Sequence, residues 1–204
     1  MKTLPLLLLF VWIVFPAKAR ADYPALPVAG CPAQTQFNLD HFSAVDGLPG
    51  LFRGGKPAQT GIECLKSAGV NAIVDLRSEG ETSRSSEESW AREAGIRYFA
   101  FPMTTDESVP SAACRSRGET AVQCNQSALL AAVQLLKQLL ADGVSEGVFV
   151  HCARGEDRTG LVLGTYRLQE QGPSQGWTKA RARQEMREYG YSPYPSLQSI
   201  WDAL

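Results

Sequence analysis

The sequence predicts an α/β fold in which a central sheet with a parallel core is flanked by helices on both faces. Short, wholly apolar segments of strand length alternate with segments of helical pattern, and strands buried on both faces of a parallel sheet have that composition. Glycines separate several helical patterns from the next strand, as at many helix ends. A length of 204 residues, with 44% apolar and 20% charged residues, fits one globular domain.

Residues 1–21 have the features of a secretory signal peptide. Lys2 supplies the positive start, residues 4–15 are almost wholly apolar, and Ala19-Arg20-Ala21 matches a small-residue cleavage site. The apolar run is shorter than the roughly 20 residues that span a bilayer, so we expect no stable membrane anchor after cleavage. We therefore expect an exported protein, periplasmic or secreted.

The rest of the chain divides into an extended lead-in over residues 22–50, rich in proline, glycine and polar residues, and a compact domain over residues 51–204. Two alternatives concern processing. Ala17-Lys18-Ala19 is a second cleavage point, and Val28-Ala29-Gly30-Cys31 resembles a lipoprotein box. Charged residues separate that box from the apolar run, which disfavours lipidation.

The first half of the compact domain contains two helix–strand units. A Thr-x-x-Glu capping box opens a predicted helix over residues 60–69, and a buried strand follows over residues 70–76. Ser85 with Glu88 caps a second helix that ends at Gly95, before a strand over residues 96–101.

The second half begins with a long polar loop over residues 102–125. Apolar residues spaced by three or four predict a helix from residue 126, ended by Asp142-Gly143, and residues 148–150 form a short apolar strand. Further helices are predicted over residues 159–170, 174–189 and 195–203.

The chain has five cysteines, and an odd number in an oxidising compartment indicates paired structural cysteines plus one thiol kept for another purpose. Cys114 and Cys124 bracket a polar stretch, so we expect a disulfide between them, and Cys31 would then pair with Cys64. Four cysteines allow three connectivities, so this pairing is a hypothesis. No CxxC or HxxxH spacing indicates a metal site, and we expect neither metal nor cofactor.

The charge balance excludes binding through a broad basic surface. Removal of residues 1–21, which carry three basic residues and no acid, leaves 17 basic and 21 acidic residues, a net charge of −4. We therefore expect no nucleic acid and no anionic membrane as partner. An anion would have to be captured by a local site.

Such a site is predicted at residues 151–160, HCARGEDRTG, between the last apolar strand and a helix. A tight loop that enters a helix N-terminus aims backbone N–H groups at one point and, with the helix dipole, binds a phosphate-like dianion. Gly155 permits positive φ inside the loop, and Gly160 and Gly164 allow the helix to lie close to the sheet. The expected phosphate-binding residues are Ala153, Arg154, Gly155, Glu156, Asp157 and Arg158.

The same loop has the chemistry for a covalent phosphocysteine intermediate. Its N–H groups should lower the pKa of Cys152 and favour the thiolate. Arg158 can bind two oxygens of a phosphoryl group through its planar fork, and Thr159 can donate to the sulfur. We interpret His151 as a structural hydrogen-bonding residue that orients the loop.

The HCxxGxxRTG pattern resembles the signature loop of the cysteine-dependent protein tyrosine phosphatase superfamily. The rest of residues 50–190 is similar to its compact dual-specificity branch, in particular to atypical members from bacteria, fungi and plants. The flanking matches, in the same order, are Arg53-Gly54-Gly55-Lys56-Pro57, Asp75-Leu76-Arg77 and Gly95-Ile96-Arg97-Tyr98. The resemblance implies a dual-specificity phosphatase-like fold for residues 51–204.

The resemblance also implies roles for individual residues. Cys152 would attack phosphorus, Arg158 would hold the phosphoryl oxygens, and an aspartate after the strand before the long helix would protonate the leaving oxygen. Asp106 is the expected acid, with Glu107 and Asp157 as rivals. The stretch between Asp106 and the helix is unusually long for the family, so the acid is less firmly placed than the nucleophile.

The predicted function is therefore an exported phosphomonoesterase of the protein tyrosine or dual-specificity type, acting on a phosphoprotein or a small phosphomonoester. The alternative is a phosphoinositide or inositol phosphate phosphatase, against which the acidic pair Glu156 and Asp157 argues because it would repel polyanions. A non-catalytic phosphate-binding module and a redox or sulfur-transfer protein are two further readings. The sequence predicts no oligomeric state.

Overall fold

The computed structural model describes residues 42–81, 84–106, 110–141, 147–192 and 194–204. Its centre is a five-stranded sheet with the order β1-β2-β5-β3-β4, in which only the short edge strand β1 is antiparallel to its neighbour. The strands are β1 (Ser43–Ala44), β2 (Leu51–Gly54), β3 (Val70–Asp75), β4 (Arg97–Ala100) and β5 (Gly147–His151). The predicted sheet with a parallel core is confirmed.

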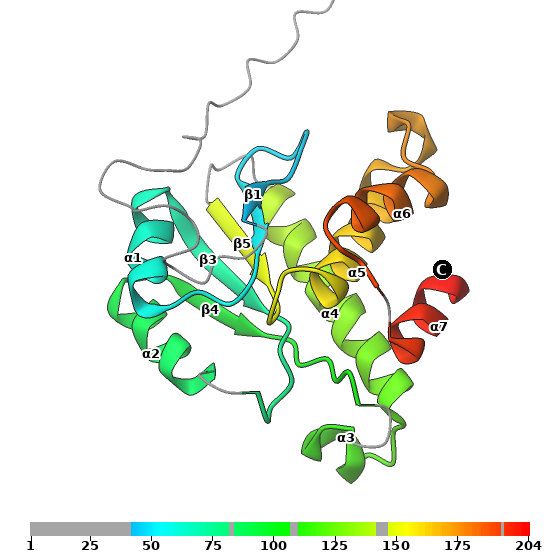
Figure 1. The fold of residues 1–204 in the computed structure, drawn as a ribbon, viewed down its shortest axis with the longest axis horizontal. Coiled ribbons are helices and arrows are strands. Elements are labelled where there is room, and N and C mark those ends of the chain that lie inside the picture. Colours follow the sequence, from blue (N-terminus) through cyan, green and yellow to red (C-terminus); the bar gives the residue numbers. More distant parts are fainter. Residues whose placement is uncertain (1–41, 82–83, 107–109, 142–146, 193) are drawn as a thin grey trace, which may run out of the picture.

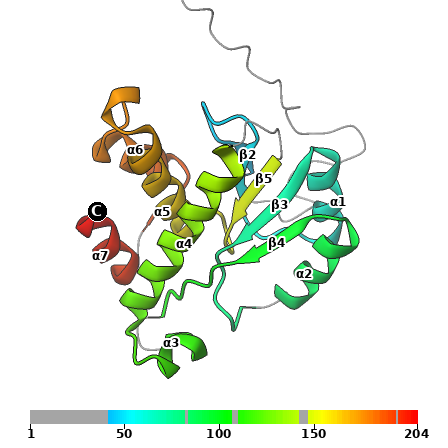
Figure 2. The same cartoon turned by 180° about the vertical axis from the view of Figure 1, so that it is seen from behind.

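Helices cover both faces of this sheet, also as predicted (Figure 1). One face carries α1 and α2, and the other carries α4, α5, α6 and α7, an arrangement that the reverse view repeats (Figure 2). The bounds are α1 (Gln59–Ser67), α2 (Arg84–Glu93), α3 (Ala112–Ser116), α4 (Ala121–Ala141), α5 (Asp157–Tyr166), α6 (Lys179–Glu188) and α7 (Pro195–Ala203). A π-helical segment over Arg167–Gln171 and a 3₁₀ turn over Pro173–Gln175 join α5 to α6.

Strand residues point alternately into two hydrophobic cores. On β5, Val148 and Val150 belong to the core under α4 and α5, whereas Phe149 belongs to the core under α1 and α2. Phe42, which precedes β1, stacks on Phe149 with ring centroids 5.8 Å apart. Val45 is also buried, so the packed domain includes part of the segment that the sequence assigns to the lead-in. Residues 1–41, with the expected signal peptide, lie outside the described residues.

Several predicted helix starts are wrong, including that of α6, which begins at Lys179 and not at residue 174. The helix expected from Thr60 begins at Gln59 and has Ala58 as its N-cap, and α2 begins at Arg84, so Ser85 is inside it. The expected loop over residues 102–125 contains α3 and the first turn of α4, which starts at Ala121. That turn is fixed by a reciprocal cap, in which Thr120 Oγ1 accepts from Gln123 N while Gln123 Oε1 accepts from Thr120 N.

Gly160 and Gly164 of α5 lie against other helices, and not against the sheet as the sequence predicted. A Cβ on Gly164 would lie 2.8 Å from Met186 Sδ and 3.1 Å from the Trp201 ring. A Cβ on Gly160 would contact Tyr191 and Met186. These glycines therefore let α6 and α7 approach α5, and they do not serve its contact with the sheet.

In the part of the chain that the structure describes, no helix combines the length and the apolar character needed to cross a membrane.

Candidate active site

Four loops start from one line at the carboxyl edge of the sheet. His151 at the end of β5 is in register with Gly54 of β2 and with Asp75 of β3, and Asp75 is in register with Ala100 of β4. The segments that follow these strands therefore meet beyond the same edge, where α/β sheets bind their ligands.

The loop after β5 has a shape that only glycine allows at residue 155. Gly155 has φ of 78°, and a Cβ there would lie 2.4 Å from the carbonyl carbon of Gly54. The two loops are also hydrogen-bonded, since Lys56 N donates to Ala153 O at 3.1 Å. Helix α5 then begins at Asp157, two residues before the predicted start.

Arg53 supports this loop from the end of β2. Its side chain is buried and donates through Nη2 to Gly155 O at 2.8 Å. The guanidinium lies 3.7 Å from the ring centroid of Tyr189, a cation–π contact. Burial, partly offset by nearby groups, lowers the pKa of Arg53 to about 10. Arg53 therefore supports the backbone of the loop.

Cys152 lies at the start of the loop with its side chain 3% exposed. Among the described residues it is the only free cysteine. Burial alone would raise the pKa of the thiol, but the charge of Arg158, the Thr159 hydroxyl and the backbone N–H groups of Thr159 and Gly155 outweigh it and lower that pKa. The Thr159 hydroxyl is buried and has no other well-aligned partner among the described groups, so it is available to the sulfur.

Arg158 makes three hydrogen bonds to two residues. Its Nη1 donates to Met103 O at 3.1 Å, and its side chain is 6% exposed. Glu81, in the loop after β3, forms a two-pronged ion pair with it: Nη2 donates to Oε1 at 2.9 Å, and Nη1 donates to Oε2. The carboxylate thus occupies the fork that the sequence assigns to phosphoryl oxygens.

Glu81 is a site residue that sequence reasoning missed. Its Oε2 also accepts from Ser78 N at 2.7 Å and from Ser78 Oγ at 2.9 Å, which fixes the side chain in the loop. Burial opposes ionisation of Glu81, but the hydrogen bonds and charge of Arg158 outweigh it and lower its pKa. The available signal was its position, an acid a few residues beyond the end of a central strand.

These loops enclose a cavity of about 150 Å³ over the sulfur of Cys152. Its lining carries two arginines and three acids, so the cavity has no surplus of positive charge. The lining residues are Glu81, Thr105, Cys152, Ala153, Arg154, Glu156, Asp157, Arg158 and Tyr194.

The predicted loop residues divide into exposed and buried groups. Arg154 projects from the loop with its side chain 61% exposed, and its Nε donates to Glu156 Oε2 at 2.7 Å. Asp157 is buried and accepts from Ser192 N at 2.8 Å. Burial and the neighbouring Glu156 raise the pKa of Asp157. Because Asp157 binds a backbone amide inside the fold, its role here is structural.

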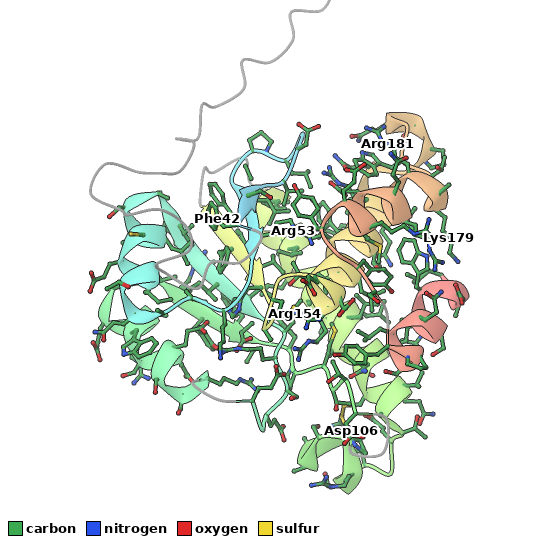
Figure 3. All side chains as sticks on the ribbon, in the orientation of Figure 1. Phe42, Arg53, Asp106, Arg154, Lys179 and Arg181 are labelled. Carbon is green, nitrogen blue, oxygen red and sulfur yellow. A yellow bond between two sulfur atoms is a disulfide. The ribbon has the colours of Figure 1, made fainter. Side chains whose placement is uncertain are left out.

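Asp106 lines a neighbouring cavity of about 310 Å³, not the cavity over Cys152. Figure 3 shows it beside α3, away from Arg154 on the phosphate loop. The residue before it, Thr105, does line the Cys152 cavity, so the expected acid is one residue from the site. The rival acid Glu107 lies outside the described residues.

His151 is fully buried beneath the loop, as a structural residue should be. Its Nδ1 lies 3.2 Å from Cys152 O, and its Nε2 lies 2.8 Å from Glu87 Oε1 of α2, a close ion pair. Arg77 is also buried, where it donates to Asp75 and to Glu87. These charged groups form a cluster that joins the sheet to α2.

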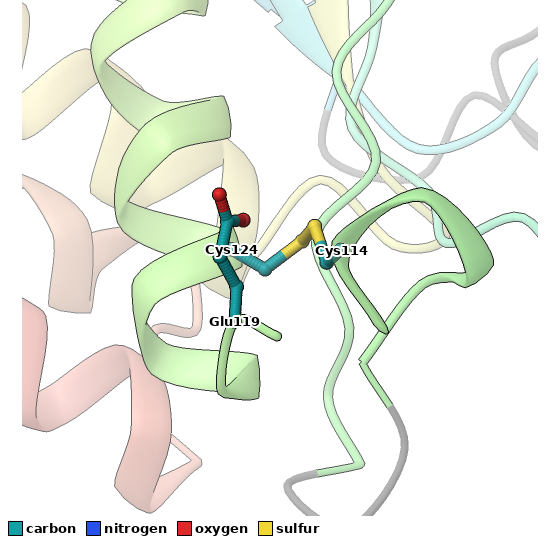
Figure 4. A group of neighbouring side chains, drawn as sticks. All are labelled: Cys114, Glu119 and Cys124. Atoms are coloured by element: carbon teal, nitrogen blue, oxygen red, sulfur yellow. A yellow bond between two sulfur atoms is a disulfide. The ribbon is translucent and has the colours of Figure 1, made fainter. Parts of the chain in front are cut away.

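The predicted disulfide between Cys114 and Cys124 is present and ties α3 to the first turn of α4 (Figure 4). Glu119 lies beside it but is held by Arg117 through two hydrogen bonds of 2.8 Å. Because both sulfurs are bonded to each other, this cluster does not offer thiolates to a metal. Cys64 is disulfide-bonded as well, and its expected partner Cys31 lies outside the described residues.

The sequence of residues 50–166 matches the model of the tyrosine phosphatase family. The chain is similar to the dual specificity protein phosphatase TpbA of Pseudomonas aeruginosa strain UCBPP-PA14, with 24% identity over 173 residues, or 85% of this chain. It spans 64% of the length of that relative and 52% of TpbA from a second strain of the species.

Solved structures share the fold. A putative phosphatase from Shewanella putrefaciens CN-32 has a TM-score of 0.57 at 18% identity, covering 81% of this chain and 89% of that one. The crystal structure of P. aeruginosa TpbA has a TM-score of 0.52 at 21% identity, covering 80% and 89%. The family match over more than half of the sequence, which includes the loop around Cys152 and Arg158, shows that the chain belongs to the tyrosine phosphatase family.

Proposed function

We propose that the protein is an exported phosphomonoesterase of the tyrosine or dual-specificity type that works through a phosphocysteine intermediate. The observation that carries the proposal is the environment of Cys152: a buried thiol with a lowered pKa, facing loop amides and the guanidinium of Arg158. Export rests on the sequence of residues 1–21.

In the first step the Cys152 thiolate attacks phosphorus. The S–P bond forms as the ester P–O bond breaks, and Arg158 with the loop N–H groups binds the equatorial oxygens. The leaving oxygen takes a proton from a carboxylic acid, and that residue then removes a proton from the water that splits the S–P bond. In the second step Thr159 donates a hydrogen bond to the departing sulfur.

Among the described residues we weigh Glu81 and Asp106 for the acid role, because Asp157 accepts from a backbone amide inside the fold and Glu156 accepts from Arg154. Glu81 is already in the Cys152 cavity, but Arg158 lowers its pKa and keeps it ionised, so it has no proton to give. Asp106 follows the cavity residue Thr105 directly and is an exposed side chain. We therefore assign the acid role to Asp106.

The cavity favours substrates with a single phosphoryl group. Its volume of about 150 Å³ is small, and Glu81, Glu156 and Asp157 balance the two arginines of its lining. A second phosphate beside the first would meet these acids and not an unpaired cation, which disfavours highly phosphorylated inositols. Monoesters of tyrosine, serine or threonine in a protein fit this charge balance.

Turnover by the mature chain tests the proposal. Cys152→Ser should abolish hydrolysis of para-nitrophenyl phosphate, while inorganic phosphate still binds and the thermal unfolding midpoint stays within a few degrees. Quenching wild-type protein in acid during turnover should trap one phosphate per chain, and Cys152→Ser should trap none. Retained turnover in Cys152→Ser would contradict the nucleophile.

A substrate panel and a fractionation test the two finer points. Phosphotyrosine peptide, phosphoserine peptide, a phosphoinositide and inositol hexakisphosphate are compared by kcat/KM, and a tenfold preference for either inositol compound would refute the substrate class but not the mechanism. Expression of the full chain in a bacterium, followed by mass spectrometry of the periplasm and medium, should recover a protein that starts near residue 22. Recovery of uncleaved chain in the cytosol alone would refute export.

A further inference from the structure

Each of the two ring nitrogens of His151 has an oxygen atom close to it. Nδ1 lies 3.2 Å from the carbonyl oxygen of Cys152, and Nε2 lies 2.8 Å from the Glu87 carboxylate. The Nδ1 contact is a hydrogen bond, whereas the Nε2 contact is too poorly aligned for one and is an ion pair by distance alone. An ion pair with the carboxylate requires the imidazolium, because a neutral imidazole carries no charge.

The charges around the ring also require the imidazolium. Asp75 on β3, Glu87 on α2 and Arg77 after β3 are all fully buried and sum to one negative charge. Asp75 Oδ1 lies 3.8 Å from Nε2 of His151. A positive charge on His151 makes this buried group neutral, and a buried charge left without a partner costs several kcal/mol.

The remaining polar neighbours do not replace that charge. Tyr98 of β4 donates its hydroxyl to Asp75 Oδ2 at 2.5 Å and is uncharged. Arg84 of α2 approaches the same oxygen at 3.7 Å but is partly exposed at the rim. On its other side the imidazole stacks on Phe149, with ring centroids 5.3 Å apart. Although burial lowers the pKa of His151, Glu87 and Asp75 outweigh it and raise that pKa.

The cluster does not have the form of a metal site. Ligand atoms of Asp75, Glu87 and His151 lie within 4.8 Å of one another. However, Arg77 occupies the space among the carboxylates, with Nη2 at 2.9 Å from Asp75 Oδ2 and 2.6 Å from Glu87 Oε2. A guanidinium there excludes a divalent cation on both steric and electrostatic grounds.

We propose that Glu87 is a positioning residue for the nucleophile: its carboxylate holds His151 as an imidazolium, which binds the carbonyl of Cys152 and keeps a positive charge beneath the phosphate loop. Glu87 makes no contact with the substrate site and acts only through His151. The inference rests on the proposed role of Cys152 and adds to it a link from α2 to the reactivity of the sulfur.

The test is the pH dependence of Cys152 alkylation by iodoacetamide, a neutral reagent that reacts with the thiolate. Glu87→Gln keeps the shape of the side chain and should raise the midpoint of the curve of alkylation rate against pH by about one pH unit. At pH values below the midpoints of both proteins, the variant should be alkylated about tenfold more slowly than the wild type. At high pH the two rates should be equal. Glu88→Gln, an exposed neighbour on the same helix, is the matched control and should leave the midpoint unchanged.

A double variant separates action through His151 from a direct effect. His151→Asn should raise the midpoint at least as far as Glu87→Gln, and combining the two should add nothing further. An unchanged midpoint in folded Glu87→Gln, or fully additive shifts, would overturn the proposal. A purely structural role would lower the unfolding midpoint without moving the alkylation profile.

The unmodified protein supplies a readout that does not depend on the folding of a variant. The chain has only two histidines, so the ¹⁵N spectrum of the ring nitrogens is readily assigned. We expect both nitrogens of His151 to carry protons at pH 7, and a neutral imidazole at that pH would refute the proposal. If the alkylation shift is found but no phosphomonoester is hydrolysed, the proposed function fails while this inference stands.

Discussion

Glu81→Gln tests whether the carboxylate in the active-site fork competes with the ligand. Glu81 accepts from both Nη atoms of Arg158, and a phosphate dianion that binds through the same two atoms would have to displace it. Glutamine keeps the length and shape of the side chain but removes its charge. We therefore expect the variant to bind inorganic phosphate more tightly than the wild-type protein.

The size of the effect follows from the ion pair. Hydrogen bonds to charged groups contribute about 1.5–3 kcal/mol each when well shielded. The Glu81 side chain is 29% exposed and that of Arg158 is 6% exposed, so solvent screens the pair and the lower end applies to the pair as a whole. If Glu81→Gln lowers the free energy needed to displace this side chain from Arg158 by about 1.4 kcal/mol, the inhibition constant for phosphate falls tenfold.

The assay measures competitive inhibition of para-nitrophenyl phosphate hydrolysis by inorganic phosphate, with titration calorimetry as a direct check. Glu79→Gln removes the same charge from the same loop without touching Arg158, and it should leave the inhibition constant within twofold. Phosphate binding that is equal or weaker in Glu81→Gln would refute competition. It would show that Glu81 orients Arg158 for the ligand instead.

Three further predictions concern the acid, the loop and the buried cluster. Asp106→Ala should lower kcat about 100-fold for an alkyl phosphate but less than tenfold for para-nitrophenyl phosphate, whose leaving group needs little protonation; equal losses would exclude Asp106 as the acid. Gly155→Ala places a Cβ 2.4 Å from Gly54 at positive φ, so it should destabilise the fold by about 3 kcal/mol and lower the thermal midpoint by roughly 10 °C, whereas Gly80→Ala, in open space, should not. Burial opposes ionisation of Asp75, but its positively charged neighbours outweigh it and give a pKa of about 2 against an ordinary 3.8. Its stabilising contribution is therefore present above about pH 4 and lost as the pH falls toward 2, and urea unfolding of Asp75→Asn should show a deficit at pH 7 that shrinks by pH 2.5; a constant deficit would contradict this.

Local sequence patterns were sufficient for strands β3, β4 and β5 and for the loop around Cys152, but they did not predict β1 or β2. Apolar runs predicted the central strands β3 and β5, because both faces of these strands are buried. The positive φ of Gly155 follows from its position between the end of a strand and the start of a helix. Helix starts were less predictable. The Thr-x-x-Glu box at Thr60 is not used, whereas the equivalent Thr120-x-x-Gln123 pattern is used and was overlooked.

Contacts between distant segments account for the rest. Glu81 and Arg158 are 77 positions apart and meet only because β3 and β5 are neighbours in the sheet. The same holds for Arg53, which supports Gly155 from 102 positions away. No periodicity or short motif encodes such pairs, so the sequence located Cys152 and Arg158 but not the groups that hold them.

The common starting line of the four loops has a consequence for how this domain tolerates change. Side chains alternate between the two faces of a strand, so inserting a single residue into β5 would exchange the positions of Phe149 and Val150 and swing the imidazole of His151 away from α2. We therefore expect the length of β5 to affect the reactivity of Cys152, although the β5 residues before His151 do not line the cavity over its sulfur. We expect insertions and deletions in active relatives to occur mainly in loops at the opposite edge of the sheet. To change specificity, residues of the loops around the Cys152 cavity can be replaced while the number of residues in each strand is kept.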